Sequence, residues 1–124
     1  GGNGTASSYS GSSVTYAGGG GGGGRGSSAS SGGSGGGGRG AQTSGQSNLA
    51  GTANTGGGGG GGQGVYGTGA TFTGKNGGSG IVIVRYSDSL DEMASIGAGL
   101  TYNFSTSGGY HIYKFTAGTG SVEF

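Results

Sequence analysis

Three unbroken glycine runs, at residues 18–24, 35–38 and 56–62, constrain this chain more than any other feature of its sequence. A glycine run has no side chains to bury, and ordering it costs more conformational entropy than ordering any other sequence. Glycine makes up 41 of the 124 residues, hydrophobic residues only 27%, and cysteine is absent. An ordered state must therefore rest on backbone hydrogen bonds, on self-association, or on both.

The glycine runs allow two interpretations. Composition alone favours a flexible Gly/Ser linker, while the alternative is a packed set of polyglycine-II helices, which have three residues per turn and no internal hydrogen bonds. In such a packing, neighbouring helices satisfy each other's N–H and C=O groups, and only glycine permits close approach on every side. Collagen is excluded, because the chain has no proline and no strict period of three.

Composition divides the chain near Gly80. All four carboxylates, Asp88, Asp91, Glu92 and Glu123, follow this point, and most glycines precede it. We therefore predict a polyglycine-II region at residues 1–80 and a region of β-strands and hairpins at residues 81–124. The expected fold class is mostly irregular and β, with packed polyglycine-II helices, short antiparallel strands and little or no α-helix.

The second region carries the clearest strand pattern. Residues 81–86 (Ile-Val-Ile-Val-Arg-Tyr) are typical of a strand buried on both faces, and such a strand needs an ordered neighbour. Residues 88–98 contain the only helical signal, a short capped turn. Alternating residues at 100–104, 110–115 and 121–124 predict a meander of two hairpins.

The sequence offers little for catalysis or cofactor binding. One histidine, four carboxylates and no thiol point away from an enzyme, and no cofactor or metal site is predicted. Residues 69–75 match a phosphate-binding loop, but Asn76 follows where Ser or Thr is needed. A net charge of +1 argues against nucleic acid as a partner, and the longest apolar run, 81–84, is too short for membrane insertion.

Several segments together resemble a glycine-rich domain of bacteriophage tail-fibre and adhesin proteins of the polyglycine-II type. They are Ser-Gly-Ser-Ser-Val-Thr-Tyr-Ala at 10–17, Gly-Thr-Ala-Asn-Thr at 51–55, Gly-Gly-Ser-Gly-Ile-Val-Ile-Val-Arg-Tyr at 77–86, and Gly-Tyr-His-Ile-Tyr-Lys-Phe-Thr-Ala-Gly-Thr-Gly-Ser-Val at 109–122. The pattern they resemble also has an earlier β segment and glycine run, which this sequence lacks. The resemblance makes packed helices the main interpretation and implies a place on the virion surface, in a phage tail or capsid fibre.

The leading functional hypothesis is an adhesin module, in which rigid glycine helices present the spacers at their ends to a host-surface glycan or protein. The candidate receptor contacts are Arg39, Gln42, Gln46, Asn48, Asn54 and Tyr66. The alternative is a purely structural fibre or assembly component, or a self-assembling extracellular filament. In either case we expect a homo-oligomer, a trimer by the resemblance, among other virion fibre or tail proteins. The candidate interface residues are Ile81, Ile83, Tyr113 and Phe115.

Overall fold

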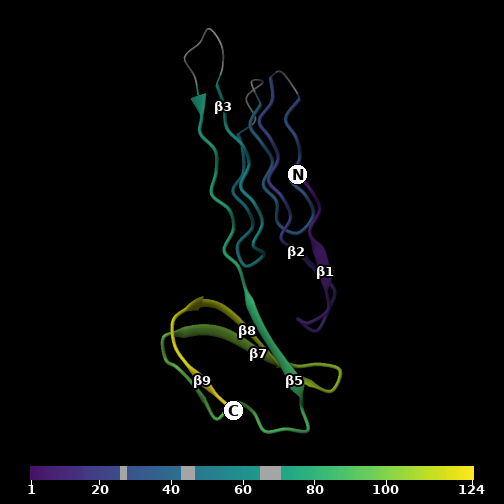
Figure 1. Cartoon of the computed structure of the whole chain (residues 1–124), viewed down its shortest axis with the longest axis vertical. Helices are drawn as coiled ribbons and strands as arrows, with labels where there is room; N and C mark the ends of the chain where they lie inside the picture. Colours follow the sequence, from purple (N-terminus) through teal and green to yellow (C-terminus); the bar gives the residue numbers. More distant parts are fainter. Residues whose placement is uncertain (26–27, 43–46, 65–70) are drawn as a thin grey trace. The chain divides into compact units, whose positions relative to one another are not determined.

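The computed structural model describes residues 1–25, 28–42, 47–64 and 71–124 (Figure 1). The chain divides into two compact units, and each is described by itself. Unit 1 comprises Gly1–Ala6 and Thr15–Gly80, and unit 2 comprises Ser7–Val14 and Ile81–Phe124. This division differs from the predicted regions 1–80 and 81–124, because Ser7–Val14 belongs with the C-terminal strands and not with the glycine-rich region.

The described residues contain short β-strands and no helix. The strands are β1 (Thr5–Ser7), β2 (Val14–Tyr16), β3 (Gln63–Gly64), β4 (Thr71–Phe72), β5 (Val82–Ser87), β6 (Ser95–Ile96), β7 (Leu100–Thr106), β8 (Tyr110–Gly118) and β9 (Val122–Glu123). The expected fold class is therefore confirmed. The helical turn expected at residues 88–98 is wrong: this segment contains β6, and its Met93 amide donates to the Tyr113 hydroxyl at 3.2 Å instead of to a helical carbonyl.

Extended segments of unit 1 run side by side and are joined by backbone hydrogen bonds (Figure 1). Three of them, residues 18–24, 35–42 and 56–62, are parallel and form a closed ring. The first donates to the second, the second to the third, and the third back to the first. We call these three segments the central rods.

Hydrogen bonds between the central rods recur every third residue. The amides of Gly18, Gly21 and Gly24 donate to the carbonyls of Gly35, Gly38 and Ala41 at 2.8–3.0 Å. The other two pairs repeat at the same interval, with the bonds Gly38 to Gly58, Ala41 to Gly61, Gly58 to Gly18 and Gly61 to Gly21. An interval of three matches one turn of a polyproline-II-type helix. The central rods are therefore polyglycine-II helices.

Each central rod is followed in the sequence by an outer rod that runs antiparallel to it. The outer rods are residues 28–34, 47–52 and 73–79, and their amides donate to central carbonyls, as from Gly33 to Gly19, Leu49 to Arg39 and Lys75 to Gly60. Parts of these stretches were predicted to be spacers at the rod ends, because they are rich in Ser, Ala, Thr and Asn. An outer rod has an open side where such side chains fit, and Ser30, Ser31 and Leu49 are exposed there.

Unit 2 is built on a three-stranded antiparallel sheet in the order β5-β8-β7. β7 and β8 form the first predicted hairpin, but β9 pairs with β6 and not with β8, so the second predicted hairpin is wrong. The expectation that residues 81–86 are buried on both faces is also wrong in part. β5 is an edge strand, and Val82 is 63% exposed.

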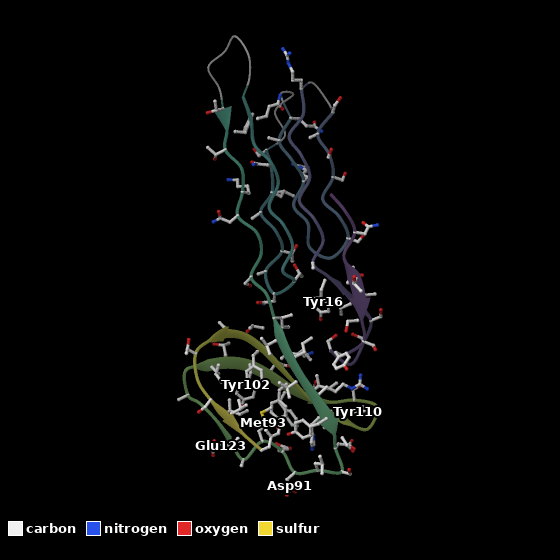
Figure 2. The ribbon with its side chains drawn as sticks, in the orientation of Figure 1. Tyr16, Asp91, Met93, Tyr102, Tyr110 and Glu123 are labelled. Atoms are coloured by element: carbon white, nitrogen blue, oxygen red, sulfur yellow. The ribbon has the colours of Figure 1, made fainter. Side chains whose placement is uncertain are left out.

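One face of this sheet is aromatic and forms the core of unit 2. Tyr113 on β8 lies at its centre, only 2% exposed, with its ring centroid 4.6 Å from Phe104 and 6.1 Å from both Tyr86 and Tyr102. Buried Met93, labelled in Figure 2, comes from the segment before β6. Aromatic rings thus supply most of the buried surface on this face, while the fully buried Ile112 lies on the opposite face.

Burial of the phenol, with the neighbouring Tyr113 hydroxyl as a further cause, raises the pKa of Tyr86 from 10.0 to about 12. Between these two values the folded state retains a proton that the unfolded state has lost, so the free energy of unfolding falls as pH rises. We expect unit 2 to lose stability progressively from about pH 10 to about pH 12. Urea unfolding of the full chain at several pH values measures this loss of stability. Tyr86→Phe, which keeps the ring, should reduce the dependence of the free energy of unfolding on pH. An equal pH slope in both proteins would contradict the assignment to Tyr86.

Candidate functional site

The C-terminal ends of the three central rods, and the described residues at which the chain resumes after each of them, lie at the same end of unit 1, which we call the loop end. The described residues at this end are Gly24, Arg25, Ser28, Gln42, Ser47, Gln63, Gly64, Thr71 and Phe72. Gly24 forms a parallel bridge with Gln42, and the Gln63–Gly64 strand β3 pairs with β4. Because the central rods are parallel and in register, their C-terminal ends necessarily lie together. Residues 26–27, 43–46 and 65–70 lie outside the described residues.

The opposite end of unit 1 is closed by short, internally bonded turns. Thr55 Oγ1 donates to the Thr52 carbonyl at 2.7 Å, and the Asn54 amide donates to Ser79 Oγ at 2.9 Å. Asn54 itself has φ of +60°, a left-handed conformation that Asn tolerates better than most residues. The polar groups of this end are therefore bonded within unit 1, either inside the turn or to the neighbouring outer rod.

The receptor candidates separate into different environments. Asn48 is 4% exposed, and its side-chain amide donates to the carbonyls of Thr73 and Gly60 at 2.6 and 3.2 Å, so it joins rods instead of facing a partner. Asn54 belongs to the closed turn at the opposite end. Gln46 and Tyr66 lie outside the described residues.

Arg39 and Gln42 are the receptor candidates that lie on a central rod, residues 35–42, toward the loop end. Arg39 is half-buried, and its Nε and Nη2 donate to the Ser47 carbonyl at 3.2 and 3.1 Å. This contact holds Ser47, the first residue of the outer rod 47–52, against Arg39. Gln42 is half-buried beside Gly24.

All formal side-chain charge in residues 1–80 is positive, carried by Arg25, Arg39 and Lys75. Arg25 and Lys75 are exposed, and Arg25 directly follows a central rod at the loop end. With no carboxylate in this region, the loop end attracts anionic groups weakly instead of repelling them.

The four predicted interface residues lie on two strands of unit 2. Ile81 and Ile83 are half-buried, and Ile83 lies on the edge strand β5. Tyr113 and Phe115 lie on β8, whose two edges are both occupied by neighbouring strands. The Tyr113 ring is in addition enclosed by the aromatic core.

A cluster of metal-ligating side chains and a membrane-spanning helix are both absent from the part of the chain that the structure describes. No three His, Asp or Glu side chains gather there in a way that could hold a metal ion. Nor does this part contain a helix with the length and apolar character needed to cross a bilayer.

The rods consist largely of glycine, and the comparison with known families identifies a glycine-rich domain. Residues 1–87 match the family model described as a glycine-rich domain, and the chain belongs to this family. The match covers unit 1 and continues through β5. No curated protein and no solved structure matches the chain.

Proposed function

We propose that the chain is a virion-surface module of a bacteriophage tail or capsid fibre, in which the rods hold a set of loops against a host-surface receptor. The observation that carries this proposal is the asymmetry of unit 1. Its opposite end is closed by short bonded turns, while the C-terminal ends of all three central rods meet at the loop end. Loops carried by a rigid scaffold are the usual design of a recognition surface.

Backbone hydrogen bonding explains why the scaffold is suited to this task. The central rods are tied on every side by bonds of 2.8–3.0 Å that do not depend on side chains. Sequence at the loop end can therefore change without altering the rods. Exposed Ser, Thr and Arg side chains at this end suit the adaptable polar contacts of a glycan or protein surface.

A binding experiment with whole bacteria tests the proposal. Fluorescently labelled full-length chain is incubated with a panel of bacterial strains, and bound protein is measured by flow cytometry. A loop-end variant carries Arg25→Ser and Thr71→Val, two exposed residues of the loop end, and the matched control carries Ala53→Ser in the exposed turn at the opposite end. We expect binding to at least one strain, reduced at least tenfold in the loop-end variant and unchanged in the control. Equal binding by both variants, or no binding across the panel, would contradict an adhesin role.

A second candidate function, a structural fibre component without receptor binding, is favoured by the sheet edges of unit 2. β5 and β7 are edge strands, and Val82 and Tyr102 on them are 63% and 45% exposed. Unpaired edges with exposed apolar residues readily pair with another copy. Light scattering of the eluting full chain should then give three times the 11.4 kDa of one chain, and Val82→Lys should lower this mass. A monomer at all concentrations would contradict self-assembly.

A further inference from the structure

A small hollow of unit 2 lies between two tyrosines and an arginine. It has a volume of about 260 Å³ and is lined by Tyr9, Arg85 and Tyr110. The Arg85 guanidinium carbon lies 3.7 Å from the Tyr110 ring centroid and 5.9 Å from that of Tyr9. None of these three residues has a predicted role from the sequence alone. No local sequence pattern reveals the cluster, because Tyr9 is far from Arg85 and Tyr110 in the sequence.

The register of the sheet explains how the hollow forms. Arg85 on β5 is paired with Ile112 on β8, and Ser87 with Tyr110, so Arg85 and Tyr110 point to the same face of the sheet. This face lies opposite the aromatic core. Ser7–Val14 belongs to the same unit and supplies Tyr9, whose neighbour Ser8 accepts a bond from Arg85 Nη1 at 3.3 Å.

Arg85 retains unused capacity to bind an anion. A guanidinium has five N–H donors in a planar fork, and here Ser8 receives one of them at a long distance. The buried Nε has no hydrogen-bond partner. Stacking on Tyr110 holds the plane of the guanidinium in place without using its in-plane donors.

Charge is distributed unevenly over unit 2 in a way that favours an anion in the hollow. Lys114, the other cation of this unit, lies two residues from Ile112 on β8 and therefore shares the face with Arg85. Asp91, Glu92 and Glu123 lie in the segments that cover the aromatic core, and Tyr110 lies apart from Asp91 and Glu123 (Figure 2). Asp88, which follows β5, lies beside the turn that precedes Tyr110, since its amide donates to the Gly109 carbonyl at 3.1 Å.

We infer that the hollow is a binding site for one acidic sugar residue, such as a uronic acid within a polysaccharide. A carboxylate matches the fork of Arg85, and the C–H face of a pyranose matches the exposed ring of Tyr9, which is 60% exposed. The volume lies just below the roughly 300–1,000 Å³ of typical small-molecule sites, as expected for a single ring. The site is independent of the loop end, so the proposed function can fail while this site stands.

Titration of the full chain with methyl β-glucuronide tests the inference. Chemical shifts of the Tyr9 and Tyr110 rings report binding, with methyl β-glucoside and acetate as separate arms. We expect saturable binding of the glucuronide with a Kd of about 1 mM, the weak range of a single shallow contact. Both the neutral glucoside and acetate should bind at least tenfold more weakly. Equal affinity for glucuronide and glucoside would overturn the role of Arg85, and equal affinity for acetate would overturn the sugar assignment.

Variants keep the test decisive if Arg85 also supports the fold. Arg85→Gln should abolish glucuronide binding, and Tyr9→Ser, at an exposed position, should weaken it about tenfold while the sheet stays folded. Asp88→Asn should tighten binding a few-fold by removing the acid next to the site. Lys75→Gln in unit 1 removes an equal charge elsewhere and should change nothing. Unaltered binding in Tyr9→Ser, or an equal loss in Lys75→Gln, would overturn the site.

Discussion

Replacing Gly21 with alanine should destabilise unit 1 by about 3 kcal/mol, the upper part of the range for overpacking a tight interior. A Cβ at Gly21 would overlap the Ser30 carbonyl oxygen, and Gly21 is buried. The Gly21 amide also donates to the Gly38 carbonyl, and the Gly21 carbonyl accepts from the Gly61 amide. Relief of the overlap therefore requires rods to separate and breaks several backbone hydrogen bonds together.

The adjacent Gly22 provides the matched control. It belongs to the same glycine run, is exposed, and has no atom within 4 Å of the position that a Cβ would occupy. Gly22→Ala should be neutral or stabilise by about 0.4–1 kcal/mol, because alanine reduces the entropy of the unfolded chain. Urea unfolding followed by far-UV circular dichroism compares both variants with the parent chain. Similar stability of the two variants would contradict the close packing of Gly21 against Ser30.

Replacing Asn48 with aspartate should also cost about 3 kcal/mol at pH 7, as expected when a charge is buried without a partner. The Asn48 amide donates to carbonyls of two neighbouring rods, at Thr73 and Gly60. A carboxylate at this position would face the same oxygens with no proton to donate. Below about pH 4 the substituted side chain regains a proton and one donor, so much of the loss should disappear.

Asn76→Asp is the control for this second prediction, because its side chain is exposed on an outer rod. Thermal unfolding of the two variants at pH 7 and pH 3.5 measures the difference. We expect Asn48→Asp to regain stability relative to Asn76→Asp as pH falls. A cost of Asn48→Asp that stays constant over this range, or no cost at all, would contradict the buried bridging role of Asn48.

The glycine runs predicted the central rods because a Cβ at most of their glycines would overlap a neighbouring backbone. Each central rod contacts others on several sides, so the absence of side chains in residues 18–24 and 56–62 is directly visible in the sequence. The outer rods could not be predicted in the same way. Residues such as Ser30 and Leu49 occupy an open side, where composition does not distinguish a rod from a loop.

Candidate contact residues were harder to predict because polarity alone does not reveal burial. Asn48 looked like a surface residue in a polar spacer, yet it is buried and joins rods. Rod packing leaves carbonyls facing inward, and an amide side chain is one of the few groups that can satisfy them. That requirement depends on which rods are neighbours, which no local pattern contains.

The strands of unit 2 were predicted better than their partners. Alternation located β7 because this strand has one aromatic face and one polar face, and it located β8 because aromatic rings recur at every second residue from His111 to Phe115. β9 pairs with β6, and the ring centroid of the following Phe124 lies 5.4 Å from that of Tyr86. Sequence order favours neighbouring strands as partners, and here the contact of Phe124 with Tyr86 accompanies a different pairing.

Backbone hydrogen exchange of the full chain tests the central claim, that glycine runs fold into hydrogen-bonded rods, most directly. The amides to follow are those of Gly21, Gly38, Gly58 and Gly61, each bonded to a neighbouring central rod at 2.8–2.9 Å. The account predicts strong protection of these amides, lost together when unit 1 unfolds, and weaker protection of Gly22. Exchange of all four amides at the rate of an unstructured peptide, with protection confined to β5, β7 and β8, would contradict it.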